Sequence, residues 1–352
     1  MPQITIETII KQAKAAQTEF ETAGQEVVDE LITGLAWALL EPETNRSLSN
    51  QAVHDTGLGN ADDKFTKNYR KTLGLLRDLK NAPSVGVIKE LPEKGLVEIA
   101  RPVGVVGAVT PSTNPIATPL NNTINAIKGR NSIILAPSPK GDAVCELIVE
   151  ILQKVLVRLG HPKHLIQKIP SPASKETTNT LMQSVDLVVV TGSEKNVSSA
   201  YRSGTPAIGV GVGNVAVIID ETADLASAAR KVVTSKTFDN ATSCSSENSL
   251  VIVDDVYENA IEALQEEGGV LLDHEETQEL KDNLWIQGKL NPHLIAKSAS
   301  EIATVVGFQR PEMKQAKMLM VEESIIHSTI SRVRQLILMC TFLQERRKYH
   351  LL

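Results

Sequence analysis

The chain is poor in aromatic residues and in cysteine, and both shortages limit what it can be. Phe, Trp and Tyr make up 3% of its 352 residues, so its core must be built from Val, Ile, Leu and Ala. Such residues suit parallel strands covered by helices on both faces. The cysteines Cys145, Cys244 and Cys340 are too few and too scattered for a disulfide framework or a zinc site. We therefore expect no metal and a reducing compartment.

Other absences exclude classes of partner. The net charge of −6 argues against nucleic-acid binding, which needs clustered Lys and Arg. Residues 1–20 contain no basic segment followed by an apolar core, so we do not expect them to form a signal peptide. No apolar run approaches the roughly 20 residues that a membrane span needs. These features predict a cytoplasmic protein without a membrane partner.

The hydrophobic pattern predicts a helical start followed by alternating strands and helices. Apolar residues recur at helical spacing over residues 4–80. Beyond them, short apolar and β-branched runs at 96–111, 131–137, 164–170, 185–193 and 215–220 alternate with helical patterns at 115–129, 141–159, 174–183, 194–203 and 222–238. This order is typical of a doubly wound α/β domain with a parallel sheet. The length favours two domains, at about 150 residues each.

Two glycine-containing segments are candidates for phosphate binding. The run GVGVGN (209–214) lacks the G-x-G-x-x-G spacing and precedes an apolar strand pattern, so it is not a dinucleotide fingerprint. Thr191-Gly192-Ser193 instead ends a buried strand directly before a helix, where an anion can bind the helix N-terminus. The same residues also suit an ordinary turn capped by Ser193. These residues alone leave both interpretations open.

Cys244 lies among small polar residues in the stretch TSKTFDNATSCSSENSLVIVDD (234–255). Such a residue is either a nucleophile presented on a loop or a buried thiol beside a strand, and one cysteine does not decide between them. Cys145 falls within an apolar helical pattern and is expected to be a core thiol.

Several motifs, in this order, resemble the aldehyde dehydrogenase superfamily. They are TPSTNP (110–115), TGS (191–193), SGTPAIGVGVGN (203–214) and KTFDNATSCSSE (236–247). Together with HDTGLGNADDK (54–64), they are similar to the CoA-acylating branch, which includes the aldehyde dehydrogenase half of bifunctional alcohol–aldehyde enzymes. FDNATSCSSENS resembles acylating sulfoacetaldehyde dehydrogenases. The resemblance covers about residues 1–323.

The resemblance implies an aldehyde-dehydrogenase-like α/β fold and a chemical role for Cys244. In this family the cysteine attacks the aldehyde carbonyl, hydride passes to NAD or NADP, and a thioester remains on the enzyme. A thiolate is the reactive form, and the small residues around Cys244 leave space for a substrate. By resemblance, the Asn114 side-chain amide and the backbone N–H of Cys244 stabilise the oxyanion.

The resemblance also assigns a binding site for the nicotinamide cofactor. Thr191, Gly192 and Ser193 match the loop beside the pyrophosphate, and Pro137, Ser138 and Pro139 match the loop near the adenosine ribose. Gly209 and Gly211 are assigned to the same site, where the glycine-rich loop leaves room for the CoA arm. Many members have a lysine where this chain has Ala136, so the choice between NAD and NADP stays open.

One departure separates this chain from the hydrolytic members. They carry a glutamate in a Glu-Leu-Gly-Gly motif that activates water, whereas the matching stretch here is Gly209-Val210-Gly211-Val212. Without that base, the resemblance implies a thioester that persists until CoA attacks it.

The resemblance divides the chain into three parts. Residues 1–237 would form a helical layer and the nicotinamide-binding domain, 238–323 a partial catalytic domain, and 324–352 an aberrant basic tail. Family members run well past 400 residues, and the match stops after Ser324. The tail is either an amphipathic C-terminal helix or a frameshifted end. The family is homo-oligomeric, and an incomplete catalytic domain without the C-terminal oligomerisation segment implies open strand edges, poor solubility and doubtful activity.

The expected function is the CoA-acylating oxidation of a short aldehyde, of the acetaldehyde or sulfoacetaldehyde type, with NAD(P)+. Its small-molecule partners would be the aldehyde and CoA. One alternative is an acyl-phosphate reductase of the glutamyl-phosphate type, which shares the cysteine but uses no CoA. Another is a non-catalytic, truncated remnant that associates with full-length subunits.

Overall fold

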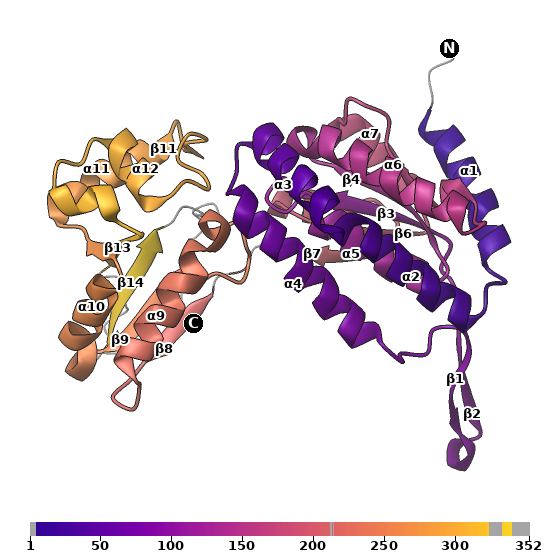
Figure 1. The fold of residues 1–352 in the computed structure, drawn as a ribbon, viewed down its shortest axis with the longest axis horizontal. Helices are drawn as coiled ribbons and strands as arrows, with labels where there is room; N and C mark the ends of the chain where they lie inside the picture. The colour runs from indigo at the N-terminus through magenta and orange to yellow at the C-terminus, as the bar shows by residue number, and fades with distance from the viewer. Residues whose placement is uncertain (1–4, 212, 214, 324–332, 340–352) are drawn as a thin grey trace. The chain divides into compact units, whose positions relative to one another are not determined.

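A computed structural model describes residues 5–211, 213, 215–323 and 333–339. The chain divides into two compact units, residues 1–57 with 61–211, and residues 58–60 with 212–352 (Figure 1). Each unit contains one five-stranded sheet. The division after Gly211 differs from the boundary expected after residue 237, because strand β8 (Ala216–Ile219) pairs with β9 (Ser249–Val253) of the second unit.

The first unit begins with helices, as the apolar spacing predicts. They are α1 (Ile6–Phe20), α2 (Gln25–Leu40), α3 (Pro42–Thr56) and α4 (Ala61–Leu79). The Glu41 carboxylate caps α3 by accepting the N–H groups of Glu43 and Thr44, and Gly57 ends this helix in left-handed backbone, at a φ of 68°. The two caps fix the length of α3 and the chain reversal that leads into α4.

The sheet of the first unit is entirely parallel, in the order β5-β4-β3-β6-β7. Its strands are β3 (Val105–Thr110), β4 (Ser132–Pro137), β5 (Ile166–Lys168), β6 (Leu187–Thr191) and β7 (Ala207–Val210), and its helices are α5 (Ala117–Lys128), α6 (Asp142–Arg158), α7 (Lys175–Ser184) and α8 (Glu194–Tyr201). Val106 and Ala108 pack with residues of α2, α5 and α6. Val105 and Val109 pack with residues of α1 and α7. Successive residues of β3 therefore enter opposite cores, which confirms the doubly wound α/β fold.

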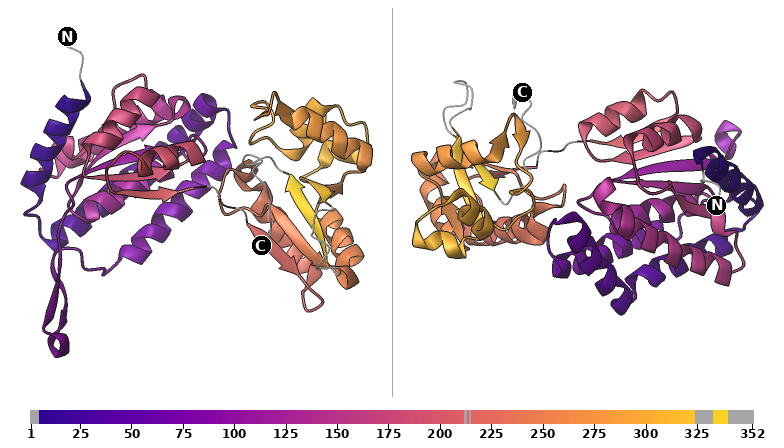
Figure 2. Two further views of the ribbon diagram at one scale, coloured as in Figure 1. Left: turned by 180° about the vertical axis from the view of Figure 1, so that it is seen from behind. Right: turned by 90° about the horizontal axis from the view of Figure 1, so that it is seen from above.

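Two strands of this unit differ from the expected pattern. β1 (Gly86–Leu91) was not expected, and it forms an antiparallel hairpin with β2 (Leu96–Ala100) that projects from the unit (Figure 2). β7 begins before the glycine run GVGVGN, so Gly209 lies inside a strand rather than in a loop. Glycine has no side chain to pack, so the glycine run does not predict a strand. β7 nevertheless pairs with β6 along its length.

The second unit has a mixed sheet in the order β10-β13-β14-β9-β8. Its remaining strands are β10 (Gly269–Leu271), β13 (Met318–Glu323) and β14 (Val333–Met339), with β11 (Trp285–Ile286) and β12 (Lys289–Leu290) as a separate pair, and its helices are α9 (Leu225–Thr237), α10 (Tyr257–Glu266), α11 (His274–Leu284) and α12 (Ala299–Val306). Ile218 on the edge strand β8 is 75% exposed.

Part of the segment expected to be a helix or an aberrant tail is a strand. β14 pairs antiparallel with both β13 and β9. Leu336 and Leu338 are buried in the core of the second unit, and Ile337 between them is only partly buried. Buried residues two positions apart are typical of a strand rather than a helix. Residues 324–332 and 340–352, with Cys340, lie outside the described residues.

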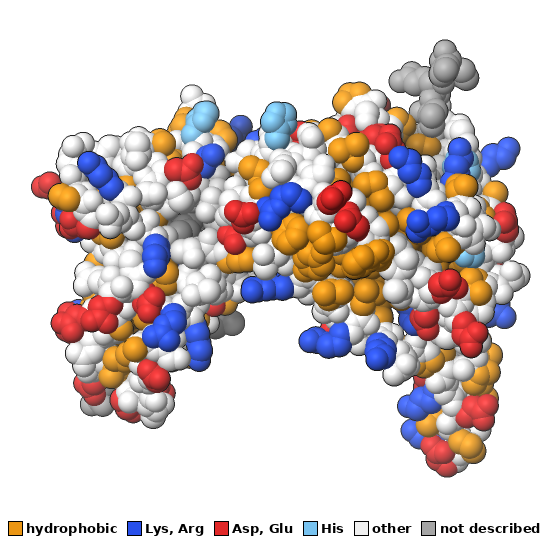
Figure 3. All heavy atoms as spheres, viewed as in Figure 1, with side chains coloured by type: hydrophobic (Ala, Val, Ile, Leu, Met, Phe, Trp, Pro, Cys, Tyr) orange, Lys and Arg blue, Asp and Glu red, His pale blue; other side chains and the backbone are white. Residues whose placement is uncertain are grey.

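Apolar side chains gather on one surface of the first unit, over α2 and α4 (Figure 3). Trp37 is 61% exposed and Leu73 52% exposed. In the described part of the chain, no helix is long and apolar enough to cross a membrane, and no cluster of His, Cys, Asp or Glu is arranged to hold a metal ion.

Candidate functional site

The predicted cofactor residues and Asn114 follow the carboxyl ends of adjacent parallel strands in the first unit. Pro137 is the last residue of β4, Asn114 follows β3, and Thr191 is the last residue of β6. From β3 the chain continues to β4 on one side within the sheet, whereas from β6 it continues to β7 on the other side. The gap between β3 and β6 is therefore a topological switch point. In doubly wound sheets ligands bind in the crevice at such a point.

The loop after β6 is built as a capped strand–helix turn. The Ser193 hydroxyl accepts the N–H of Asn196 at 3.3 Å, and Glu194 begins α8. A Cβ added at Gly192 would meet only the Asn196 side chain, at 3.6 Å. Packing therefore leaves the loop open above Gly192, so a ligand can approach the backbone there.

The loop after β4 contains a buried hydroxyl. The Ser138 Oγ atom is buried and has no hydrogen-bond partner among the described residues. A buried hydroxyl of this kind usually has a partner. The Ser138 hydroxyl is closed to a ligand in this conformation, so it does not itself mark a ribose contact.

A buried ion pair holds the base of this loop. Lys168, at the end of β5, lies 2.8 Å from Asp142 at the start of α6 and 2.8 Å from Glu146. Burial alone would raise the pKa of Asp142, but the hydrogen bond and charge of Lys168 outweigh burial and leave that pKa below its ordinary value. The pKa of Lys168 is raised, because these hydrogen bonds outweigh burial.

Gly209 and Gly211 differ in what surrounds them. A Cβ at Gly209 would lie 2.8 Å from Val197 Cγ1 and 3.0 Å from the Tyr201 ring, both on α8. The Tyr201 hydroxyl also accepts the Gly209 N–H at 3.2 Å. A Cβ at Gly211 would meet nothing within 4 Å. The packing of α8 on β7 therefore requires glycine at 209.

The loop that contains Asn114 is supported by a polar helix face that the sequence reasoning missed. The buried residues of α4 are Lys64, Lys67, Asn68 and Thr72. The Lys64 ammonium donates to the carbonyl of Thr113 at 3.4 Å, directly before Asn114. Thr72 donates to Asn121 of α5 at 3.0 Å. The signal was the position of Lys64 at the end of the motif HDTGLGNADDK.

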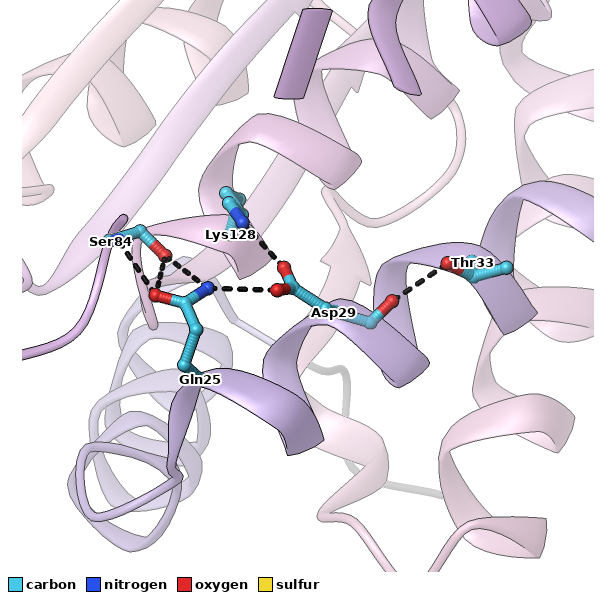
Figure 4. Close-up of polar contacts among 5 residues, drawn as sticks. All are labelled: Gln25, Asp29, Thr33, Ser84 and Lys128. Atoms are coloured by element: carbon cyan, nitrogen blue, oxygen red, sulfur yellow. Dashed lines mark hydrogen bonds and ion pairs between the residues drawn. The ribbon is translucent and has the colours of Figure 1, made fainter. Parts of the chain in front are cut away.

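Helix α5 follows this loop, and an ion pair joins its C-terminal end to α2 (Figure 4). The Lys128 ammonium donates to Asp29 at 2.5 Å, and its side chain is 6% exposed. Gln25 donates to the same carboxylate at 3.1 Å, and its carbonyl oxygen accepts the N–H of Ser84 at 2.8 Å. The contacts join α2, the end of α5 and the segment before β1.

Cys244 lies in the second unit and is exposed, whereas Cys145 is fully buried. Burial raises the pKa of Cys145 to about 12. Cys145 is thus a core thiol, as its helical pattern predicts. Cys244 sits within a turn in which the N–H and the hydroxyl of Ser246 donate to the carbonyl of Ser243, at 3.1 and 2.9 Å. The thiol of Cys244 is therefore open to reagents, whereas that of Cys145 is not.

Backbone in an unusual conformation precedes this turn. Asp239, Asn240 and Ala241 have φ values of 50°, 48° and 57°. Left-handed backbone costs roughly 1–2 kcal/mol per residue for a residue with a Cβ, less for Asp and Asn. Three such residues in succession persist only where other contacts hold them. Sequence reasoning did not find this feature.

The first unit is a doubly wound domain with an open loop at its switch point, and the second unit exposes a cysteine before a strand. Comparison with known families agrees with these features. The aldehyde dehydrogenase family model matches residues 2–272, and the chain belongs to this family. The acylating sulfoacetaldehyde dehydrogenase of Cupriavidus necator is 53% identical over 92% of this chain and 66% of its own length.

Solved structures of aldehyde dehydrogenases also match this chain. The acetylating aldehyde dehydrogenase of Geobacillus thermoglucosidasius matches with a TM-score of 0.86 and 35% identity, over 90% of this chain and 70% of that one. The Rhodopseudomonas palustris propionaldehyde dehydrogenase with bound propionyl-CoA matches with a TM-score of 0.81 and 28% identity, over 90% and 69%. The chain thus spans about two thirds of the length of these three proteins.

Proposed function

We propose that this protein oxidises a short aldehyde to an acyl-CoA with NAD+ or NADP+, and that Cys244 is the nucleophile. The observation that carries the proposal is the exposed thiol of Cys244 in a family member whose packing requires glycine at position 209. The names of the Cupriavidus, Geobacillus and Rhodopseudomonas proteins, which describe acylating or CoA-bound enzymes, support it.

The proposed reaction starts with attack of the Cys244 thiolate on the aldehyde carbonyl, which forms a C–S bond and an alkoxide. The Asn114 amide and the Cys244 N–H are the proposed donors to that oxygen. NAD(P)+, held by the loops at the switch point, would supply the hydride acceptor for the same carbon, and loss of that hydride would leave a thioester on Cys244. The CoA thiolate then attacks this carbonyl and Cys244 leaves as a thiolate. The balance is aldehyde, CoA and NAD(P)+ to acyl-CoA, NAD(P)H and a proton.

The proposed nicotinamide-cofactor site uses the loops at the switch point. Thr191, Gly192 and Ser193 would hold the pyrophosphate, and Pro137, Ser138 and Pro139 would face the adenosine ribose. Gly209 within β7 and Gly211 just after it complete the proposed site. The open space over Gly192 supports the assignment of the pyrophosphate loop.

The proposal also assigns one role to each unit: the first unit binds the cofactor, and the second unit carries the nucleophile. The aldehyde is of the acetaldehyde or sulfoacetaldehyde type. We propose a cytoplasmic enzyme, because three scattered cysteines suit a reducing compartment. We further propose self-association, which the exposed apolar residues Val87, Val97 and Ile99 of the β1–β2 hairpin favour.

The test is NAD(P)H formation by the full chain with acetaldehyde or sulfoacetaldehyde, with and without CoA. Turnover should require CoA and yield acyl-CoA rather than free acid. Cys244→Ala should lower it by about a thousand-fold or more, because the covalent step is lost. Cys145→Ala is the matched control and should retain turnover. Reduction of an acyl phosphate without CoA, or cofactor binding with no turnover, would contradict the proposal.

A further inference from the structure

We propose that Asp239 is a positioning residue whose carboxylate holds the turn that presents Cys244. Its side chain is 0% exposed, and it lies five positions before the cysteine. The expected effect on acyl transfer at Cys244 rests on the proposed function. The hydrogen bonds by which the carboxylate holds the turn do not depend on that function.

The carboxylate binds the turn directly. The Thr242 hydroxyl donates to Asp239 Oδ2 at 2.6 Å, and the Thr242 N–H donates to the Asp239 carbonyl at 3.1 Å. Thr242 is itself buried, at 6% exposure. A short hydrogen bond from a hydroxyl to a carboxylate is among the strong ones. It closes the left-handed stretch at the residue two positions before Cys244.

The other carboxylate oxygen reaches a distant part of the sequence. Asp239 Oδ1 accepts the backbone N–H of Asn60 at 2.9 Å. Leu58–Asn60 belongs to the same compact unit as Asp239 and connects α3 to α4 along the chain. One side chain therefore bridges the cysteine turn and the α3–α4 connection.

A third segment completes this arrangement. The Asn240 side chain donates to the carbonyl of Ala296 at 3.1 Å, and the Gly59 N–H donates to the same carbonyl at 3.4 Å. Ala296 also has left-handed backbone, at a φ of 55°. The connection 58–60, the turn 239–242 and Ala296 thus hold one another, and the unfavourable backbone before Cys244 is stabilised by these bonds.

The position of Cys244 matters more for some reactions than for others. Acyl transfer from a bound thioester needs the sulfur aligned with a carbonyl carbon, and a misplacement of about 1 Å can lower such a rate about a hundred-fold. Alkylation by iodoacetamide needs only an accessible thiolate. Loss of the carboxylate contacts should therefore slow acyl transfer and leave alkylation nearly unchanged.

The experiment compares Thr242→Val, which removes the hydroxyl at nearly constant shape, with Thr242→Ser, which keeps it. Asp239→Asn, which removes the charge, is the second route to the same loss. Mass mapping of the Cys244 peptide in the full chain gives its rates of acetylation by acetyl-CoA and of alkylation by iodoacetamide. Hydrogen exchange reports opening of residues 239–246, and thermal melting reports folding.

In Thr242→Val, acetylation should fall ten- to a hundred-fold, alkylation should stay within about two-fold, and exchange of the turn should rise. Thr242→Ser should restore all three. Equal acetylation in the Val and Ser variants would overturn the proposal. Where even the parent chain is not acetylated, the proposed function fails. The positioning role is then decided by exchange, and unchanged exchange of the turn in Thr242→Val and Asp239→Asn refutes it.

Discussion

In the first unit the proposed cofactor loops continue directly from parallel strands, whereas in the second unit Cys244 follows three residues in left-handed backbone. The strands β3, β4 and β6 each pair on both sides, so regular hydrogen bonding fixes where their loops begin. The cysteine turn depends instead on the side chains of Asp239, Asn240 and Thr242. Regular secondary structure is thus enough to position a binding loop, whereas a residue that follows left-handed backbone depends on side-chain hydrogen bonds.

The largest effect should come from removing the buried cation beneath the cofactor loops. Lys168→Met leaves Asp142 buried without its partner, so the free energy of unfolding should fall by about 3 kcal/mol at neutral pH. Urea denaturation measures it. Because the pKa of Asp142 is lowered in the parent, the parent loses this stabilisation as pH falls through the lowered pKa, below 3.8.

Acid should affect the stability of Lys168→Met in the opposite direction to that of the parent. Without Lys168, burial raises the pKa of Asp142, so protonation in acid relieves part of the destabilisation. The difference in stability between parent and variant should therefore shrink as pH falls from 7 towards 4. At the alkaline end, the raised pKa of Lys168 means that the parent loses its contribution only above about pH 10.5. A difference that grows in acid would show that the ion pair is not what stabilises the base of the loop.

A smaller effect is expected at β7. Gly209→Ala places a Cβ against Val197 and Tyr201, so α8 must shift, at a cost of about 1–3 kcal/mol. Gly211→Ala is the matched control, because a Cβ there meets nothing and the change should be neutral or slightly stabilising. Thermal melting of the two variants separates them. Equal melting temperatures would mean that packing does not require the glycine at 209.

Loss of the contact between α2 and α5 should have a moderate effect. Asp29→Ala leaves the buried Lys128 ammonium without this carboxylate, and Asp29 is 43% exposed, so we expect a loss of about 1–2 kcal/mol. The double variant with Lys128→Met should recover part of the loss, because no buried charge is then left unpaired. Additive losses in urea denaturation would contradict a coupled pair.

The smallest effect, and one of opposite sign, should come from the cysteine turn. Ala241→Gly relieves left-handed backbone but gives up a buried methyl group, so we expect a stabilisation of up to about 1 kcal/mol. Ala228→Gly, within helix α9, is the control and should destabilise by about 0.5–1 kcal/mol. Destabilisation by both changes would show that the turn is not strained at Ala241.

The same contrast explains what the sequence could predict. The sequence predicts correctly that a strand ends at Thr191 and that a helix follows Ser193, because local signals, an apolar run followed by a helix cap, determine that turn. The sequence does not predict β7, because Gly209 within it carries no β signal and its pairing depends on β6. The left-handed turn was missed because Asp239 is held by Asn60, which is remote in sequence. Local patterns predict structure that is locally determined, and remote hydrogen bonds are invisible to them.

The most direct test of the account is the mass of the Cys244 peptide after the full chain is incubated with acetyl-CoA and no nicotinamide cofactor. The account predicts one acetyl group on Cys244 in the parent and in Cys145→Ala, and none in Cys244→Ala. No acetylation, or acetylation at another residue that persists in Cys244→Ala, would contradict Cys244 as the nucleophile that exchanges acyl groups with CoA.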